Sequence, residues 1–322
     1  MKYGNVPGID KPVSRLVQGC VMLKPDNWES GANLLDDVFA LGCRTFDTAH
    51  CYGSGGSERT LGRWITERGV RDKVVVITKG AHPYGGRNRV TPLDITADVV
   101  ESLERLGTDF IDLYLLHRDD LAMAVGPIID VLNQHKKAGR IGAFGGSNWT
   151  HQRIAEANAY AKANGREGFT VSSPNFSLAE QVQPPWADCL TISGPANVDA
   201  RAYYRKAKMP LFCWSSLAGG FFSGKITREN TDALGEYFGK LCRDCYFTDD
   251  NFERLARVTQ LAAEKDATVT QIALAWVMSQ PLDIYALVGC ASGDEFRQNV
   301  EALDLKLTPA ECEWLDLQAA AR

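Results

Sequence analysis

The sequence predicts an α/β protein: a parallel (β/α)8 barrel with an N-terminal β-hairpin and long loops at the C-terminal face. Strand-like and helix-like runs alternate along the chain, a pattern typical of parallel strands connected by helices. Eight strand-like runs are present, and 322 residues fit such a barrel as one unit. We therefore expect a single domain over residues 1–322, with no internal repeat.

The strands are recognised as short apolar runs. Residues 1–15 hold two alternating pieces around Pro7 and Gly8, which predict a hairpin that could close one end of the barrel. The barrel strands are expected at residues 15–20, 43–47, 73–78, 110–116, 141–145, 169–173, 210–214 and 284–288.

Helix-like runs separate these strands, and several carry end signals. Pro92 precedes one run and Gly107 follows it, while Gly139 ends another. Helices are expected at residues 28–41, 57–68, 96–106, 128–138, 150–161, 198–207, 251–265, 270–279, 294–303 and 308–318.

Two connections are longer than barrel loops usually are, at residues 174–209 and 222–250. The first contains Pro184, Pro185 and Trp186, a composition typical of a loop over an active site rather than of a packed element. We expect both insertions to shape a binding site.

Composition points to a small-molecule partner. Apolar residues make up 45% of the chain and charged residues 23%, and the net charge of -5 argues against a nucleic-acid surface. The N-terminus lacks the apolar core of a signal peptide, and no uninterrupted apolar run could span a membrane. A cytoplasmic protein without membrane contact is expected, and no pattern indicates its oligomeric state.

The nine cysteines predict reduced thiols, because no secretion signal accompanies them. Cys20, Cys43, Cys213 and Cys290 lie in or beside predicted strands, as small buried side chains would. Cys242 and Cys245 have the spacing of half a zinc site, but no second pair completes it. We interpret that spacing as coincidence and expect no metal.

Four polar side chains lie at or just beyond the carboxyl ends of three consecutive predicted strands. Asp47 ends one strand and Tyr52 follows it, while Lys79 and His117 follow the next two. A parallel barrel brings such ends together around one cavity. The sequence therefore predicts that these four residues form one site.

The chemistry of these groups is proton transfer at an oxygen atom. A tyrosine hydroxyl has a pKa of about 10, and an ammonium about 4 Å away contributes roughly 4 kcal/mol toward lowering it at an effective dielectric near 20. We expect Lys79 to lower the pKa of Tyr52, Asp47 to hold Lys79, and neutral His117 to orient a carbonyl oxygen. Carbonyl reduction would also need a hydride carrier, yet residues 53–58 fail the Rossmann fingerprint at its third glycine.

Six segments in order resemble the signature segments of the aldo-keto reductase superfamily, and they span almost the whole chain. They are LGCRTFDTAHCYGSGGSE, VVVITKG, DLYLLHRDD, IGAFGGSNW, FCWSSLAGGFFSGK and TQIALAWVMSQP. The resemblance implies a TIM barrel that binds nicotinamide at its C-terminal face. It also implies that Tyr52 is the general acid or base, that Lys79 and Asp47 tune it, and that His117 orients the substrate.

The same resemblance implies the cofactor contacts. Ser147 and Asn148 would hold the carboxamide and Trp214 would stack on the nicotinamide ring, while Ser173 replaces the glutamine usual in the family. The complete set implied is Ser147, Asn148, Ser173, Trp214, Ser215, Leu217, Gly219, Gly289, Ser292, Glu295 and Asn299.

The cofactor is expected to be NADP(H) or NAD(H). Glu295 stands where the family often has an arginine for the adenosine 2'-phosphate, and a carboxylate there would repel that phosphate. Arg297 is placed where it could compensate. The family usage favours NADP(H) and the local charge favours NAD(H).

Other functions stay open at this point. The chain could be a cofactor-binding regulatory subunit, similar to the channel-associated members of the superfamily, or a barrel lyase or isomerase without nicotinamide. For an enzyme, His50 and Ser173 near the predicted mouth are compatible with a sugar or polyol substrate. The tryptophans Trp28, Trp149 and Trp186 could either pack or line the pocket.

Overall fold

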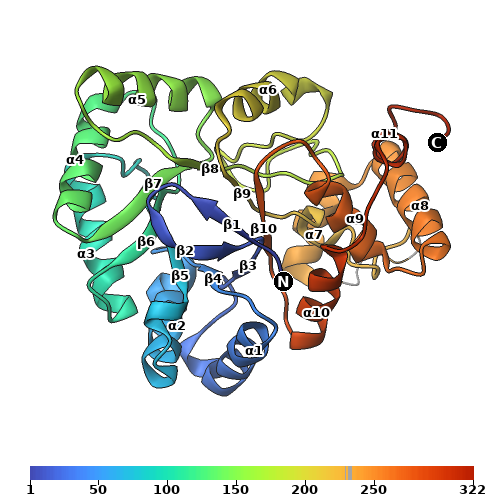
Figure 1. The fold of residues 1–322 in the computed structure, drawn as a ribbon, viewed down its shortest axis with the longest axis horizontal. Helices are drawn as coiled ribbons and strands as arrows, with labels where there is room; N and C mark the ends of the chain where they lie inside the picture. The colour runs from blue at the N-terminus through green and yellow to red at the C-terminus, as the bar shows by residue number, and fades with distance from the viewer. Residues whose placement is uncertain (229, 231–233) are drawn as a thin grey trace.

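Eight strands form a closed parallel barrel in the order β10-β3-β4-β5-β6-β7-β8-β9 (Figure 1). The structure is a computed structural model that describes residues 1–228, 230 and 234–322. The strands are β3 (Leu16–Gly19), β4 (Thr45–Asp47), β5 (Val75–Gly80), β6 (Ile111–Leu116), β7 (Ile141–Ser147), β8 (Val171–Ser173), β9 (Leu211–Cys213) and β10 (Ile284–Val288). The predicted (β/α)8 barrel is confirmed.

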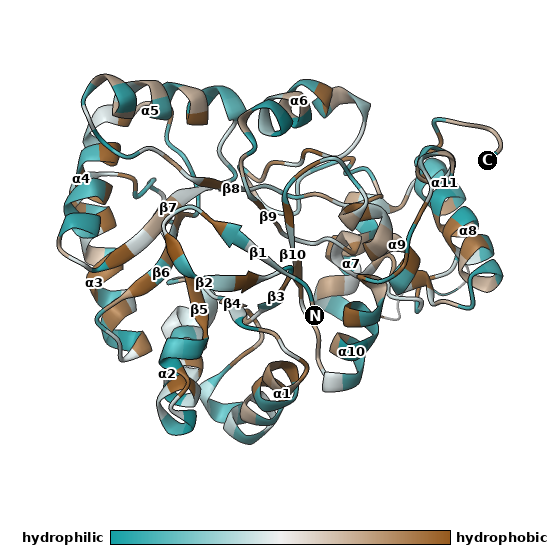
Figure 2. Ribbon diagram, viewed as in Figure 1, coloured by the Kyte–Doolittle hydropathy of each residue, from teal (hydrophilic) through white to brown (hydrophobic). Residues whose placement is uncertain are grey.

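Helices surround the barrel, with apolar residues on the strands and hydrophilic residues on the outer faces of the helices (Figure 2). No helix in the described part of the chain combines the length and the apolar character that crossing a bilayer requires. The helices are α1 (Trp28–Ala40), α2 (Gly56–Arg68), α3 (Pro92–Leu106), α4 (Val125–Lys137), α5 (His151–Ala163), α6 (Val198–Ala207), α7 (Glu236–Tyr246), α8 (Asp249–Glu264), α9 (Val269–Met278), α10 (Gly293–Ala302) and α11 (Pro309–Leu315).

Several element ends differ from the sequence expectation. Helix α3 begins at Pro92 instead of residue 96, because the Thr91 hydroxyl caps it by accepting from the Asp94 amide and proline fits a first helical turn. Helix α7 lies inside residues 222–250, which were expected to be an insertion, and residues 229 and 231–233 of that stretch lie outside the described residues.

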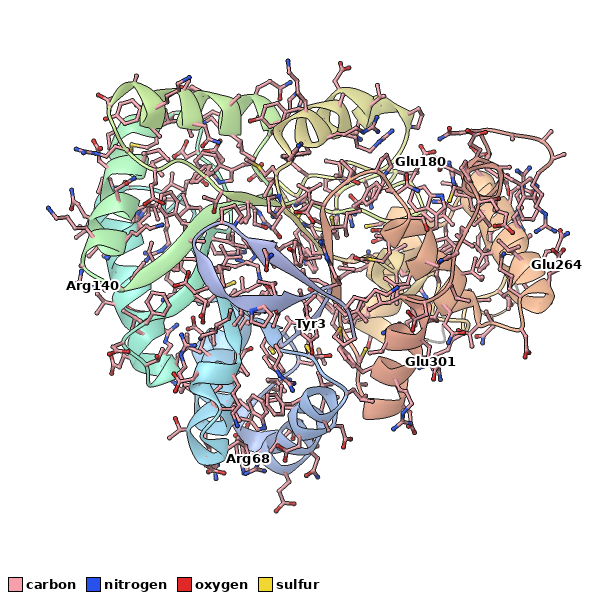
Figure 3. All side chains as sticks on the ribbon, viewed as in Figure 1. Tyr3, Arg68, Arg140, Glu180, Glu264 and Glu301 are labelled. Carbon is pink, nitrogen blue, oxygen red and sulfur yellow. The ribbon has the colours of Figure 1, made fainter. Side chains whose placement is uncertain are left out.

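The N-terminal hairpin closes one end of the barrel. Strands β1 (Tyr3–Val6) and β2 (Ile9–Ser14) pair in antiparallel fashion, and Figure 3 shows Tyr3 near the middle of the view, over the barrel. The Lys11 ammonium bonds the carbonyl oxygen of Val74, and the Tyr285 hydroxyl bonds that of Asn5, so the hairpin covers the amino ends of the strands. The predicted plug is confirmed.

The inside of the barrel is a packed apolar core. Side chains of the hairpin and of the strands share this core: Val6, Ile9, Val13, Val17, Val75, Ile77, Leu113, Leu115, Ala143, Val171, Phe212, Tyr285 and Leu287. This core and the hairpin therefore fill the amino end of the barrel.

Replacement of Leu113 by alanine tests the importance of this core. Leu113 is fully buried, so Leu113→Ala should lower the free energy of unfolding by about 2–5 kcal/mol. Leu93, 79% exposed, is the matched control, and Leu93→Ala should change it by less than about 0.5 kcal/mol. Denaturant unfolding measures both; similar losses in the two variants would contradict the assignment.

Candidate active site

The barrel brings the four predicted catalytic residues to its open end. Asp47 is the last residue of β4, Lys79 lies one residue before the end of β5, and His117 follows β6 directly. These strands are neighbours, with Asp47 paired to Ile77 and Lys79 paired to Leu115. Tyr52 begins a short turn after β4. The predicted meeting of the four residues therefore occurs, although Lys79 is inside its strand.

Asp47 and Lys79 form a buried ion pair. The Lys79 ammonium lies 2.6 Å from Asp47 Oδ2 and donates a second hydrogen bond, of 2.9 Å, to the carbonyl oxygen of Thr48. Burial alone would lower the pKa of Lys79, but the charge of Asp47 and the nearby Tyr52 raise it above its ordinary value. Lys79 is therefore a positive charge fixed at the base of the site.

Tyr52 faces this charge and the His117 ring. The Lys79 nitrogen is 5.1 Å from the centre of the Tyr52 ring, and the Tyr52 and His117 ring centres are 5.8 Å apart. Burial raises the pKa of Tyr52 to about 12, although Lys79 acts to lower it. Lys79 therefore acts in the expected direction, but the net pKa of Tyr52 is raised in the free protein, because removing a phenolate from water outweighs the attraction of one ammonium. Tyr52 keeps its proton.

His117 is neutral and is held from two sides. Burial, followed by the positive charges of Lys79 and Arg118, places the pKa of His117 well below its usual value. The Cys51 sulfur lies 3.6 Å from His117 Nδ1, and the Asn148 amide donates to the His117 carbonyl oxygen over 3.2 Å. Sequence reasoning missed Cys51; its position next to Tyr52 was the only signal.

Ser147, Asn148 and Ser173 lie together at the ends of β7 and β8. The Ser147 hydroxyl donates to the Ser173 carbonyl oxygen over 3.0 Å, and the Asn148 amide donates to Ser147 Oγ over 3.2 Å. The Ser173 hydroxyl itself is buried without a hydrogen-bond partner among the described residues. An unsatisfied buried polar group costs about 1–3 kcal/mol, so this hydroxyl is suited to a ligand.

The segment after β9 continues the site. Asn175 fixes its start by donating to the Trp214 carbonyl oxygen over 3.0 Å, and Ser215 and Gly219 have left-handed backbone angles, with φ of 51° and 60°. The Trp214 indole nitrogen is buried and lacks a partner within the described chain. Leu217, also expected here, packs partly buried against the core.

The end of β10 and the start of α10 complete the predicted cofactor set. Ser292 caps α10 by accepting from the Glu295 amide over 3.2 Å, just beyond Gly289. Glu295 accepts from the Ala291 amide over 2.9 Å, and Lys225 approaches it at 3.5 Å. Asn299 Oδ1 is buried and unpaired among the described residues.

The residues present fit a dinucleotide. Three unpaired buried groups, on Ser173, Trp214 and Asn299, follow the open end of the barrel from β8 to α10. They offer an elongated polar ligand both donors and acceptors, and the amino end of α10 favours negative charge.

The first long insertion reaches this site, as expected. The Leu190 amide donates to Asn148 Oδ1 over 3.1 Å, so the insertion is tied to a predicted cofactor residue. Trp186, at its tip, is 46% exposed and donates to the Tyr237 hydroxyl of the second insertion over 3.2 Å. The two insertions therefore contact each other.

Some polar and aromatic residues lie elsewhere than the mouth. The His50 imidazole is 2.8 Å from Glu101 on α3, because that carboxylate attracts it toward the outer layer, so the expected place at the mouth is wrong. Trp149 is buried against Phe169, with ring centres 5.0 Å apart. The Trp28 ring stacks against the guanidinium of Arg63. Both of these tryptophans pack.

The burial predicted for four of the cysteines is confirmed. All nine are free, and Cys20, Cys43, Cys213 and Cys290 are buried. Cys242 and Cys245 are buried on α7, and no group of three potential metal ligands exists in residues 1–228, 230 and 234–322.

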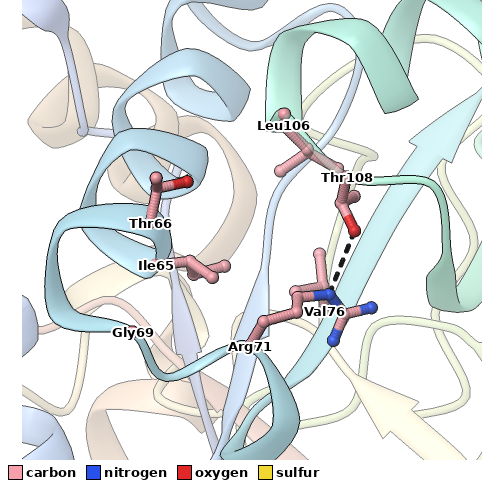
Figure 4. A pocket seen from close by; sticks show the side chains of 8 residues that line it. Ile65, Thr66, Gly69, Arg71, Val76, Leu106 and Thr108 are labelled. Carbon is pink, nitrogen blue, oxygen red and sulfur yellow. Dashed lines mark hydrogen bonds between the residues drawn. The ribbon is translucent and has the colours of Figure 1, made fainter.

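A cleft of about 130 Å³ lies far from this chemistry, between the ends of α2 and α3 (Figure 4). Arg71, which donates to the Thr108 hydroxyl over 3.2 Å, and the early β5 residue Val76 line it. These residues belong to the amino end of the barrel, and none of the four predicted catalytic residues lines the cleft. It is not the candidate active site.

Comparison with known proteins supports this picture. The chain is 27% identical over 303 residues to a probable aryl-alcohol dehydrogenase of Saccharomyces cerevisiae, covering 90% of this chain and 88% of that one. It is 26% identical over 305 residues to an NADP(+) aldo-keto reductase of Schizosaccharomyces pombe, covering 91% and 84%.

A solved structure shares the fold. A thermostable aldo-keto reductase in complex with the inhibitor epalrestat matches 99% of this chain and all of its own, with a TM-score of 0.75 and 19% identity. The model of the Aldo/keto reductase family matches residues 16–317, nearly the entire chain. The protein therefore belongs to the aldo-keto reductase family, whose members are oxidoreductases that act on carbonyl groups.

Proposed function

We propose that the protein is an NAD(P)(H)-dependent oxidoreductase that reduces an aldehyde or ketone, or oxidises the corresponding alcohol, with Tyr52 as the general acid or base. The supporting observation is the meeting of a protonated Tyr52, a charged Lys79 and a neutral His117 at one end of the barrel. The relatives named as an aryl-alcohol dehydrogenase and an NADP(+) reductase act in the same chemical class.

During reduction, the carbonyl oxygen accepts a hydrogen bond from the Tyr52 hydroxyl. Tyr52 passes its proton to that oxygen as negative charge develops there. The positive charge of Lys79 then stabilises the phenolate that remains, by roughly 4 kcal/mol for charges about 4 Å apart at an effective dielectric near 20. Asp47 keeps Lys79 in place and protonated.

His117 positions the oxygen through its second ring nitrogen. Burial raises the pKa of Cys51 to about 11, so its thiol is protonated and can donate to His117 Nδ1. Nδ1 is then the acceptor, and Nε2 carries the ring hydrogen. Neutral His117 can therefore donate to the carbonyl oxygen beside Tyr52.

A nicotinamide dinucleotide, when bound, supplies or accepts the hydride. Ser147, Asn148 and Ser173 would hold its nicotinamide end, and Trp214 would lie against that ring. The segment from Ser215 to Gly219 and the start of α10 would hold the rest.

We propose that Glu295 decides between the two dinucleotides. Its carboxylate accepts from a ribose hydroxyl readily, whereas it repels a 2'-phosphate. Two cations lie near this position: Arg297 pairs with Asp294 at 2.6 Å, and Lys225 lies 3.5 Å from Glu295, both on the exposed surface. This local charge favours NAD(H), although the Schizosaccharomyces relative is named for NADP(+).

Tyr52→Phe tests the proton donor. The variant should lower kcat for carbonyl reduction by about 10²- to 10⁴-fold while leaving dinucleotide binding unchanged. Tyr84→Phe, at a position 80% exposed, is the control and should keep full activity. A wild-type protein that binds the dinucleotide but turns over no aldehyde, ketone or sugar would point instead to a regulatory subunit.

The pH dependence of reduction follows from the pKa values of Tyr52 and His117. Tyr52 is protonated below its raised pKa of about 12, and His117 is neutral above its lowered pKa. Both required forms coexist across neutral pH, so kcat/KM for reduction should be flat from about pH 6 to pH 9. Steady-state rates with a non-ionising aldehyde measure this; a tenfold fall over that range would be incompatible with these protonation states.

Glu295→Arg tests the cofactor preference. A guanidinium at this position should raise the kcat/KM ratio of NADPH to NADH by about 10- to 100-fold, since a charged hydrogen bond contributes roughly 1.5–3 kcal/mol. Glu253→Arg, on the remote helix α8, supplies the same charge change as a control. An unchanged ratio in Glu295→Arg would remove Glu295 from the cofactor site.

A further inference from the structure

One buried cation near the site lacks an anionic partner. Four lysine or arginine residues are buried in the described chain, and three of them form ion pairs with carboxylates. The pairs are Lys79 with Asp47, Arg153 with Asp119 and Arg254 with Glu180. Arg118 is the fourth; it is 5% exposed and forms no salt bridge with any described residue.

The described residues that contact the Arg118 guanidinium offer it neutral groups alone. Nη1 donates to the His117 carbonyl oxygen over 2.9 Å, Nε donates to the Ala187 carbonyl oxygen over 3.1 Å, and Nη2 donates to the Cys189 sulfur over 3.1 Å. A guanidinium has five N–H groups, so two of them remain available on the two terminal nitrogens. These contacts orient the guanidinium but leave its charge uncompensated.

The neighbouring carboxylates do not fill this role. Asp119 is 3.0 Å from Arg153 and is thereby engaged. Asp188 lies on the exposed surface of the first insertion, between the two residues that Arg118 contacts, and makes no ion pair with Arg118. Burying a charge without a partner is unfavourable, which makes Arg118 an attractive position for an external anion.

Arg118 is also close to the reacting groups. It follows His117 in the chain and shares that residue's carbonyl oxygen with the Asn148 amide. Its positive charge also acts on the half-buried His82, whose ring centre lies 5.0 Å from that of His117. The same charge acts on Cys51 and His117, the two groups that lie beside Tyr52.

We propose that Arg118 binds an anionic group of the substrate, so that the preferred substrates are carbonyl compounds bearing a carboxylate or a phosphate. This inference rests on the proposed oxidoreductase function. Two parallel N–H groups of a guanidinium match the oxygens of either anion, and such bidentate contacts are strong and directional. Arg118 and the first insertion would then set the substrate class.

Matched substrates separate charge from shape. We would measure kcat/KM for 4-carboxybenzaldehyde against 4-methylbenzaldehyde, and for glyceraldehyde 3-phosphate against glyceraldehyde, so that the two pairs distinguish carboxylate from phosphate. Wild type should prefer the anionic member of at least one pair. Arg118→Met should lower kcat/KM for that anionic member by about 10- to 100-fold and for its neutral partner by less than about threefold.

Two further variants act as controls. Arg118→Lys keeps the positive charge but loses the paired N–H groups of the guanidinium, so it should retain an intermediate preference for the anion. This variant also serves as the test if Arg118→Met fails to fold. Arg166→Met removes a surface charge that pairs with Asp130 and should alter neither member. Equal losses on the anionic and neutral members in Arg118→Met would mean that Arg118 only positions the insertion, and would overturn the proposal.

A binding measurement separates this inference from the proposed reaction. Calorimetry with benzoate, benzamide and inorganic phosphate should show an anion that binds wild type at least about tenfold more tightly than Arg118→Met, with benzamide unaffected. That result without any turnover would keep the anion site and reject the reductase function. Anion affinities that are equal in wild type, Arg118→Met and Arg118→Lys would reject the site.

Discussion

The buried ion pair between Asp47 and Lys79 is the interaction on which the candidate active site depends. Both side chains are nearly inaccessible, and their atoms meet at 2.6 Å. In this environment a lone ammonium would lose its proton and a lone carboxylate would gain one, whereas the pair keeps the ammonium charged. Burial keeps Tyr52 protonated and His117 neutral; the ammonium opposes the rise in the pKa of Tyr52 and adds to the fall in the pKa of His117.

The barrel explains why this pair forms at all. Asp47 and Lys79 lie 32 residues apart but on adjacent strands, so the register of β4 and β5 brings them together. At the opposite end the hairpin packs on the apolar core, and the polar groups there pair with one another, as Lys11 does with Asp112 at 2.8 Å. The fold thereby separates stability at the amino ends of the strands from chemistry at their carboxyl ends.

Chemistry and selectivity belong to different parts of the chain. The strand ends and the turn after β4 carry the groups to which we assign proton transfer. The insertion at residues 174–209 and the start of α10 carry the groups that we assign to substrate and cofactor choice, around Arg118 and Glu295. The insertion is connected to the barrel by two hydrogen bonds, one from the insertion to Asn148 and one from Arg118 to the insertion.

The sequence by itself determined the barrel, the N-terminal hairpin and the positions of Asp47, Tyr52, Lys79 and His117 at strand ends, because alternating periodicity and short polar motifs are local signals. Only the tertiary structure decided the raised pKa of Tyr52, the outward position of His50 and the contact between Cys51 and His117. It also revealed that Arg118 is buried and that the described residues around it offer carbonyl oxygens and a sulfur instead of a carboxylate. Each of these depends on burial and on partners distant in the chain, which residue spacing does not encode.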